Sequence, residues 1–340
     1  MINRLVWMET DNTYPYRNLA MEEYMTLHVP QGTCILYLWQ NRHTVVIGKN
    51  QNCWRECRVN FLEQENGYLV RRLSGGGAVF HDLGNLNFTF IVGAGDYDVS
   101  RQLDVILEAV RSLGIHAEKT GRNDITVDGR KFSGNAFYRT GDGCYHHGTI
   151  LIRADKENMS RYLNVSKEKL ASKGVTSVKS RVANLCEFKP DITLEEVKSA
   201  LVEAFSKVYG QPAVRMEEGE LPQPDIDART EKFASWQWKY GRKIPFEYEM
   251  EKRFPWGNIQ IQFHVDEGMI QDVNVFSDAM DQEMIGMLAE QLKGCAYAEE
   301  DICRAVKAVG TDAFQAGEYT GADEPQSCRI KEDIMTLVRE

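Results

Sequence analysis

The sequence predicts an α+β protein with a larger N-terminal domain and a small C-terminal one. Three observations support this: short runs rich in β-branched and aromatic residues, strongly amphipathic helices between them, and a strand-and-helix pattern that restarts beyond Pro255. The 340 residues also exceed one ordinary domain, for which about 150 residues is the usual prior. We expect one domain over residues 1–247 and a second over residues 253–340.

Hydrophobic spacing predicts the elements of the larger domain. A helix is expected over residues 18–28, another over 103–113 with one apolar stripe, and a third over 193–209, where Thr193 and Glu196 form a capping-box pattern. Five strands are expected, at residues 34–39, 44–48, 68–71, 85–92 and 145–152.

The rest of the chain contains a proline-rich stretch and then a new pattern. Residues 211–230, with three prolines, predict a loop or covering segment. Alternating apolar residues on both sides of the turn at 266–268 predict a hairpin, and helices are expected over residues 281–292 and 299–308.

Charge and composition exclude several classes of protein. The formal net charge of −10 argues against general affinity for nucleic acid or for an anionic membrane. Neither a signal peptide nor a membrane-spanning stretch is recognisable, so a cytoplasmic location is expected. The eight cysteines are scattered without CxxC pairs, which favours reduced thiols over a zinc site or a disulfide framework.

A triple glycine follows two arginines in the segment RRLSGGGAVFHD, residues 71–82. Three consecutive glycines after a strand leave no side chains to pack, so something must approach the backbone closely. That neighbour could be a phosphate or carboxylate, or the segment could be a bulge or hairpin corner in the backbone. The glycines alone leave both interpretations open. Neither the P-loop motif nor the dinucleotide-binding motif is present.

A hairpin is predicted around the turn Asp128-Gly129. The resulting register pairs Val127 with Arg130, Thr126 with Lys131, Ile125 with Phe132 and Asp124 with Ser133. One face then carries Asp124, Thr126, Lys131 and Ser133, and the opposite face is apolar. The polar face is either solvated, the commoner case, or the floor of a site holding a carboxylate and an ammonium.

Adjacent histidines, His146 and His147, begin another predicted strand. Their side chains must point to opposite faces, so they cannot readily share one metal ion. We expect one to be a hydrogen-bonded core or pocket residue and the other to be more exposed.

Taken in order, several segments resemble the lipoate-protein ligase A family. They are RRLSGGGAVFHDLGN, GRNDI, GRKFSGNA, HHGTIL and SVKSRVANL. The resemblance extends to residues 18–23, 38–39 and 45–48, and more weakly to Phe254-Pro255-Trp256-Gly257. The resemblance implies a biotin/lipoate-ligase-like catalytic domain with mixed sheets and surrounding helices, plus a small α+β C-terminal domain. It also implies an enzyme that uses ATP and Mg²⁺ to convert lipoate or octanoate to the acyl-AMP, and then transfers the acyl group to a lysine.

The resemblance also implies roles for individual residues. Lys131 would be catalytic, contacting both the lipoate carboxyl and the α-phosphate, and Asp124 would hold Mg²⁺. The nucleotide would be bound by Arg72, Gly77, Ala78, Val79, Phe80, Asn123, Asp124 and Lys131. Lipoate would be bound by Trp39, Arg71, Ser74, His81 and Lys131, with Val46 and Val79 helping to line the apolar tunnel.

The resemblance also implies a loop over the adenylate and protein partners, and the sequence departs from the family at one position. The loop at residues 177–184, with Lys179 and Arg181, would close over the adenylate. Tyr138 occupies the position where family members carry an arginine, and Arg139 follows it. The implied partners are the lipoyl domains of 2-oxoacid dehydrogenase E2 subunits and the glycine cleavage H protein, with no nucleic acid and no membrane.

Two rival functions remain open from the sequence. One is a cysteine-dependent octanoyl or lipoyl transferase of the same fold, for which Cys144 and Cys186 are the candidate nucleophiles. The other is a non-catalytic protein that binds lipoate or presents another protein to a ligase.

Overall fold

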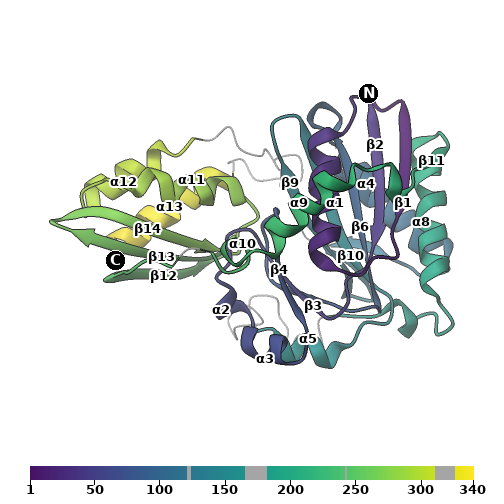
Figure 1. Ribbon diagram of the computed structural model, residues 1–340, viewed down its shortest axis with the longest axis horizontal. Helices are drawn as coiled ribbons and strands as arrows, with labels where there is room; N and C mark the ends of the chain where they lie inside the picture. The colour runs from purple at the N-terminus through teal and green to yellow at the C-terminus, as the bar shows by residue number, and fades with distance from the viewer. Residues whose placement is uncertain (121–123, 165–181, 242, 311–325) are drawn as a thin grey trace. The chain divides into compact units, whose positions relative to one another are not determined.

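The computed structural model describes residues 1–120, 124–164, 182–241, 243–310 and 326–340 (Figure 1). The chain divides into two compact units. The first comprises Met1–Ile47, Trp54–Leu73 and Ala78–Lys239. The second comprises Gly48–Cys53, Ser74–Gly77 and Tyr240–Glu340, so two short loops from the N-terminal half group with the C-terminal part.

An eight-stranded mixed sheet forms the centre of the first unit, in the order β11-β1-β2-β6-β10-β9-β8-β7. β1 runs parallel to both β2 and β11, and the other neighbouring strands are antiparallel. The strands are β1 (Arg4–Glu9), β2 (Thr33–Trp39), β6 (Asn85–Gly93), β7 (Glu118–Thr120), β8 (Asp124–Val127), β9 (Arg130–Arg139), β10 (Gly143–Leu151) and β11 (Ala213–Arg215). A smaller sheet orders β4 (Tyr68–Arg71), β3 (Thr44–Ile47) and β5 (Val79–His81).

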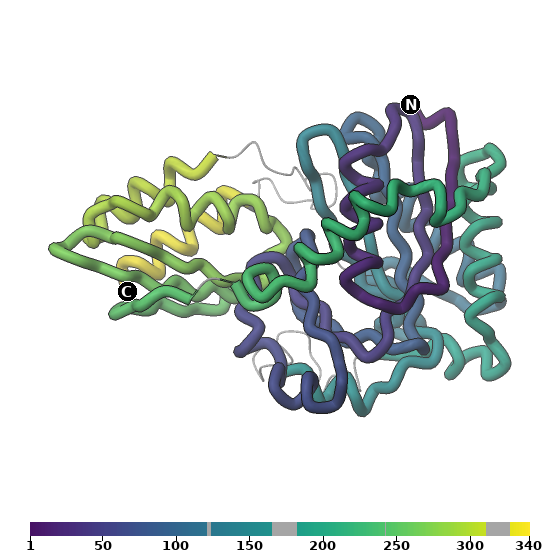
Figure 2. The backbone as a smooth tube through the Cα atoms, viewed as in Figure 1, coloured from purple at the N-terminus to yellow at the C-terminus, as the bar shows by residue number. Residues whose placement is uncertain are grey.

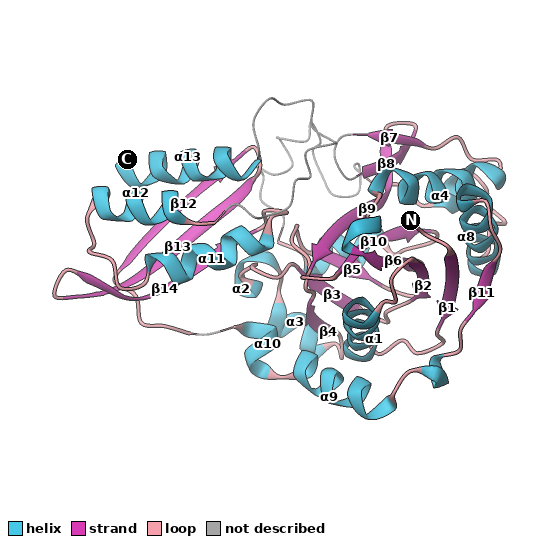
Figure 3. Ribbon diagram, turned by 90° about the horizontal axis from the view of Figure 1, so that it is seen from above, coloured by secondary structure: helices cyan, strands magenta, loops and turns pink. Residues whose placement is uncertain are grey.

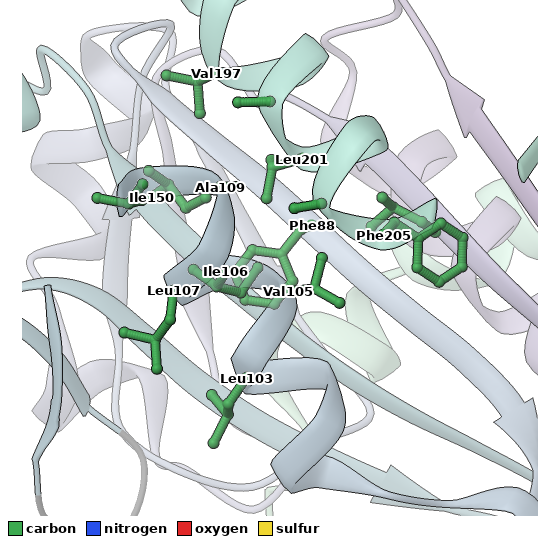
Figure 4. Close-up of a cluster of buried hydrophobic side chains, with 14 of the residues drawn as sticks. Phe88, Leu103, Val105, Ile106, Leu107, Ala109, Ile150, Val197, Leu201 and Phe205 are labelled. Atoms are coloured by element: carbon green, nitrogen blue, oxygen red, sulfur yellow. The ribbon is translucent and has the colours of Figure 1, made fainter. Parts of the chain in front are cut away.

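Helices cover both faces of the large sheet because its strands are apolar on both sides. α4 (Val99–Ser112) and α8 (Leu194–Tyr209) pack on one face, and α1 (Pro15–His28) packs on the other (Figure 3). Figure 4 shows the first of these cores, where Ile106 and Leu201 belong to one buried cluster with Phe88 of β6. The remaining helices of this unit are α2 (Cys53–Glu56), α3 (Val59–Gln64), α5 (Lys156–Tyr162), α9 (Gln223–Ala234) and α10 (Trp236–Tyr240). The first residue of α2 and the last residue of α10 group with the second unit. The 3-10 turns are η1 (Ala94–Asp96), η2 (Leu185–Glu187) and η3 (Glu218–Glu220).

Local chemistry sets the ends of these helices. Asp98 accepts a hydrogen bond from the Arg101 N–H at the start of α4. The predicted capping box of α8 is present, because Thr193 and Glu196 satisfy each other's backbone N–H groups. Gly210 ends α8 in the left-handed conformation that glycine adopts without steric cost.

Residues 211–230, predicted as a loop or a covering segment, are not a loop. The segment contains β11, η3 and most of α9, and Figure 2 shows α9 running beside α1. The prolines do not break α9, because Pro222 and Pro224 lie at its N-terminal end, where the missing N–H groups have no helical partner. Arg229 and Lys232 of α9 both pair with buried Glu23 of α1, at 2.9 and 2.6 Å.

The second unit has its own sheet and core. Its strands are β12 (Tyr248–Phe254), β13 (Gly257–Asp266) and β14 (Met269–Ser277), all antiparallel, one strand more than the expected hairpin. The helices are α11 (Gln282–Leu292), α12 (Glu299–Ala308) and α13 (Gln326–Arg339). Their apolar faces meet Ile259, Ile261 and Phe263 in a separate buried cluster. Among the described residues, no helix has the length and apolar character needed to cross a bilayer.

Candidate functional site

The β8–β9 hairpin brings the two predicted charged residues together. Lys131 Nζ lies 2.6 Å from Asp124 Oδ1, and both side chains are about one-fifth exposed. The apolar face of the hairpin, with Ile125, Val127 and Phe132, is buried in the core, as expected. The polar face therefore holds a half-buried ion pair.

The predicted register is correct only near the turn. Val127 pairs with Arg130 and Thr126 with Lys131, but a bulge then shifts the ladder, so that Ile125 pairs with Ser133 and Asp124 with Gly134. The expected pairs of Ile125 with Phe132 and Asp124 with Ser133 are wrong. A bulge adds one residue to one strand and re-aims the side chains beside it.

A glycine lies beneath the Lys131 ammonium. A Cβ atom placed on Gly134 would lie 2.6 Å from both Cε and Nζ of Lys131. The backbone of Lys131 is held as well, because its carbonyl accepts a hydrogen bond from the Ala183 N–H at 2.9 Å.

A second group of polar side chains is buried between α1 and the large sheet. Glu22 Oε1 accepts hydrogen bonds from Thr89 Oγ1 at 2.7 Å and from His147 Nδ1 at 2.9 Å. Trp39 Nε1 in turn donates to Thr89 Oγ1 at 3.0 Å. We call Glu22, Trp39, Thr89 and His147 the buried polar network.

Arg72 and His81 lie close to this network, since the Arg72 charge interacts with Glu22 and the pKa of His81 responds to His147. Burial lowers the pKa of Arg72 to about 10, opposed by Tyr145 and Glu22. Burial, with Arg72 and His147, lowers the pKa of His81 to about 3, so its imidazole is neutral at pH 7. The His81 ring meets the Trp39 ring edge-on, with centroids 6.5 Å apart.

His81 retains an unused polar atom. Asn41 Nδ2 donates to His81 Nδ1 at 3.3 Å, while the buried Nε2 has no hydrogen-bond partner in the described part of the chain. A buried polar atom without a partner costs free energy unless something binds it. Such an atom is suited to meet a polar group of a bound molecule.

The two groups of residues are connected along β10. His147 belongs to the buried polar network, and the next residue of β10, Gly148, lies against β9. A Cβ on Gly148 would lie 2.7 Å from the carbonyl oxygen of Gly134. The ion pair on β8 and β9 and the buried polar network therefore involve adjacent strands, because His147 of β10 pairs with Ala136 of β9.

The two arginines that precede the triple glycine point to different places, as alternation along a strand requires. Arg71 donates to the backbone carbonyls of Trp238 and Lys239, at 2.9 and 2.8 Å for the shortest contact to each. The charge of Arg72 acts on His81, one of the predicted acyl-site residues.

The other predicted nucleotide and lipoate residues are distributed as follows. Phe80 is buried and stacks on Tyr162, with ring centroids 5.4 Å apart, and Val79 pairs with Val46 beside the core that contains Trp39. Ala78 is half-buried at the entry to β5. Ser74 and Gly77 are described with the second unit. Asn123, Lys179 and Arg181 lie outside the described residues.

Packing of the protein's own backbone also explains part of the triple glycine. Within the second unit, a Cβ on Gly75 would lie 2.4 Å from the Ala279 carbonyl oxygen, and the Gly76 N–H donates to that oxygen at 3.1 Å. Gly76 also has a positive φ of 86°. Protein backbone thus makes at least one of the close approaches that the sequence predicted.

The two histidines correct one expectation. Both are buried, so neither is the more exposed residue predicted for one of them. His146 lies between Gln102 and Asn135, and burial lowers its pKa to about 3, with a smaller contribution from His147. Their side chains do separate to opposite faces, into different hydrogen-bonded groups.

Sequence reasoning missed Glu22 and Thr89. Glu22 is 1% exposed although it follows Met21 in what reads as an ordinary amphipathic helix. One signal was available, because Asn18, Glu22 and Met25 share one face of that helix at spacings of four and three residues. Thr89 carries no comparable signal in a β-rich run.

Comparison with known proteins adds the deciding observation. The family model described as the lipoyl protein ligase A/B catalytic domain matches residues 14–206, more than half of the chain. The chain belongs to this family. A second family model, the bacterial lipoate protein ligase C-terminus, matches residues 243–321.

Several solved structures share the fold. LipL1 from P. falciparum, solved in complex with lipoate, is 28% identical with a TM-score of 0.81, covering 97% of this chain and 99% of that one. A bi-partite lipoate protein ligase from Thermoplasma acidophilum, described with its E2 lipoyl domain, is 26% identical with a TM-score of 0.61, covering 72% and 99%. A lipoate-protein ligase A bound with ATP is 24% identical with a TM-score of 0.59, covering 71% and 99%.

This lipoyl ligase family member departs from the expected arginine at position 138. Tyr138 is half-buried beside the core on the α1 face, with its ring 5.2 Å from that of Tyr145. Arg139 is exposed. An aromatic side chain therefore stands where the resemblance implies a cation.

Proposed function

We propose that this protein is an ATP-dependent lipoate-protein ligase. It joins lipoate or octanoate to ATP to give the acyl-AMP, and it then passes the acyl group to a lysine of a lipoyl domain. The observation that carries the proposal is the Lys131–Asp124 ion pair, held on a hairpin whose other face is fixed in the core.

The first step brings two anions together. A carboxylate oxygen attacks the α-phosphorus of ATP, the bond to the β-phosphate oxygen breaks, and pyrophosphate leaves. A lysine ammonium between the carboxylate and the α-phosphate offsets their repulsion and stabilises the charge that moves to pyrophosphate. Lys131 acts in its charged form, so we assign it neither as a general base nor as the acylated residue.

The Asp124 carboxylate is suited to bind a Mg²⁺ ion that arrives with a phosphate substrate. That ion is held by one or two carboxylates together with phosphate oxygens and water. The described residues contain no cluster of three or more His, Cys, Asp or Glu that could hold a metal ion without substrate. Asp124 would therefore hold the ion jointly with ATP, and the ion would neutralise phosphate charge.

The buried polar network would form one end of the acyl site. Trp39 and Val46 provide apolar surface, and Arg72 and His81 provide polar atoms beside it. Arg71, Ser74, Gly77, Ala78, Val79, Phe80 and Asn123 keep the roles that the resemblance implies. In the second step the acceptor amine attacks the acyl carbon, loses a proton, and AMP leaves.

The described cysteines do not favour the rival transferase. Cys144 is buried, and burial raises the pKa of its thiol to about 11, opposed by Arg139. Cys186 is half-buried and packs against the core between the sheet and α4. A nucleophilic cysteine needs the opposite, a lowered pKa in an accessible place.

The test is lipoate-dependent exchange of labelled pyrophosphate into ATP, followed by a mass assay of acceptor domains. We expect exchange with lipoate or octanoate, and acylation of apo E2 lipoyl domains and H protein that is lost when their acceptor lysine is replaced. Lys131→Ala should abolish exchange. Lys119→Ala is the matched control, because Lys119 also pairs with an aspartate, Asp104 at 2.8 Å, but lies on β7, the strand next to the hairpin, and not on the hairpin itself.

Two results would contradict the proposal. Near-normal exchange by Lys131→Ala would remove Lys131 from the first step. A stable acyl-cysteine formed from an acyl-carrier thioester without ATP would identify the transferase instead, and no exchange with either acid would favour the non-catalytic alternative.

A further inference from the structure

Gly134 stands in the interior of β9, where glycine is unfavourable because it loses backbone entropy and packs no side chain. Its φ is not in the left-handed region, so the backbone conformation there does not call for glycine. The reason for the glycine must be space.

The space over the Gly134 Cα is taken by one side chain. A Cβ would lie 2.6 Å from both Cε and Nζ of Lys131, and its next neighbour, Thr149 Oγ1, would be 3.9 Å away. Asp124, which holds that ammonium at 2.6 Å, is the residue paired with Gly134 across the bulge. The end of the Lys131 side chain therefore occupies the space above Gly134 that the Cβ of any other residue would take.

The strand next to Gly134 is also closely packed, because its residue Gly148 has no room for a side chain. Gly148 of β10 lies against the Gly134 carbonyl, and a Cβ there would lie 2.5 Å from the Phe88 ring and 2.7 Å from that carbonyl. Phe88 is fully buried, so this packing cannot give way. Gly134 cannot sink into the sheet to make room for Lys131.

We propose that Gly134 is a positioning residue, whose missing side chain lets the Lys131 ammonium rest beside Asp124. This rests on the proposed function, because it assigns Gly134 to the placement of the group that meets the carboxylate and the α-phosphate. The atoms a methyl group would meet are the far end of a flexible side chain, so Gly134→Ala moves the ammonium and keeps the fold.

The first measurement compares Gly134→Ala with Gly141→Ala. Gly141 lies in the exposed turn between β9 and β10, and a Cβ there meets nothing within 4 Å. Because a misplacement of about 1 Å can cost about 100-fold in rate, we expect Gly134→Ala to lose at least about tenfold in pyrophosphate exchange. Gly141→Ala should match the wild type, and equal exchange by the two variants would overturn the proposal.

The second measurement follows Lys131 without using activity. Trace acetylation with acetic anhydride, read by peptide mass spectrometry, gives the labelling of Lys131 relative to Lys119. Loss of the Asp124 contact should raise this ratio severalfold in Gly134→Ala and leave it unchanged in Gly141→Ala. An unchanged ratio in Gly134→Ala would mean that the ammonium has not moved, and would contradict the proposal.

A double-mutant cycle separates the lysine from the backbone. Without the Lys131 side chain the added methyl group has nothing to displace, so Gly134→Ala should leave the urea midpoint of Lys131→Ala unchanged. If it lowers that midpoint as much as it lowers that of the wild type, or prevents folding in both backgrounds, the glycine serves the sheet and the proposal fails. If the wild-type protein shows no pyrophosphate exchange, only the proposed function is refuted. The acetylation ratio of Lys131 and the double-mutant cycle would still test the positioning role of Gly134.

Discussion

At the scale of single residues, the buried carboxylate of Glu22 organises the interior of the α1 face. It accepts two hydrogen bonds at one oxygen, from a hydroxyl and an imidazole on different strands. A carboxylate this deeply buried is costly unless its hydrogen bonds are made. Glu22 therefore fixes the orientation of His147 and, through Thr89, that of Trp39.

Removing this carboxylate should have a large effect on stability. Glu22→Ala leaves Thr89 and His147 without their acceptor, and each unsatisfied buried group costs about 1–3 kcal/mol. We expect the free energy of unfolding to fall by about 2–4 kcal/mol in urea titrations. Glu22→Gln keeps an acceptor oxygen and should lose clearly less, and equal losses for the two variants would show that volume rather than hydrogen bonding matters there.

At the scale of elements, the sequence was informative where a periodic pattern and a local signal agree. The helix over 193–209 was predicted from its stripe and its capping box, and both are present. The hairpin was correct only as far as its turn determines it, because a bulge has no signature in the spacing of polar and apolar residues. The helix α9 was missed because its prolines read as breakers, whereas its stability comes from packing on α1.

The same reasoning applies to the candidate site. Lys131 and Asp124 come from one hairpin, so a turn motif was enough to bring them together on paper. The buried polar network joins α1, β2, β6 and β10, and contacts between elements so far apart in sequence depend on tertiary packing. Spacing along the chain could place Glu22 on the buried face of its helix, but it could not show which residues of other elements Glu22 contacts.

One carboxylate holds the start of β9 in place. Glu187 of η2 accepts hydrogen bonds from the Asn184 N–H at 2.7 Å, from Lys156 at 2.5 Å and from Arg130 at 2.7 Å. Partial burial raises its pKa, but these hydrogen bonds outweigh it and lower the pKa from 4.5 to about 2. Arg130 precedes Lys131, so this contact helps to hold the hairpin.

The lowered pKa gives Glu187 a defined dependence on pH. A carboxyl whose folded pKa is below its unfolded value stabilises the fold above about pH 4.5, and this stabilisation is lost as pH falls toward about 2. Because Glu187 is partly exposed, we expect Glu187→Gln to cost only about 1 kcal/mol at pH 7. The difference from wild type in urea midpoint should shrink below pH 4.5.

A suitable control is Glu203→Gln, on the exposed face of α8. It should differ little from the wild type at either pH. A difference between wild type and Glu187→Gln that stays constant from pH 7 to pH 3 would contradict the role assigned to the ionised carboxylate.

At the scale of the whole molecule, the triple-glycine loop groups with the second unit, although it is embedded in the sequence of the first. Within that second unit, Gly75 approaches the backbone at Ala279 and Met280. Such an approach excludes any side chain at Gly75, and backbone cannot move aside as a flexible side chain can.

Gly75→Ala should therefore destabilise the protein. A Cβ would lie 2.4 Å from the Ala279 oxygen and 2.7 Å from that of Met280, and overpacking of this kind costs about 1–3 kcal/mol. We expect a lower midpoint in differential scanning calorimetry. Gly286→Ala is the control, because Gly286 is exposed within α11 with no atom close to its Cβ position, and alanine there should be neutral or stabilising. An unchanged midpoint for Gly75→Ala would contradict the close approach.

The hydrogen bond from the Gly76 N–H to the Ala279 carbonyl has a practical consequence. An amide proton exchanges with deuterium only when its hydrogen bond opens, and its rate measures the free energy of that opening. The Gly76 amide is thus a built-in reporter of how often the loop separates from Ala279. Recorded with and without ATP and lipoate, one amide signal would show whether substrates slow that opening.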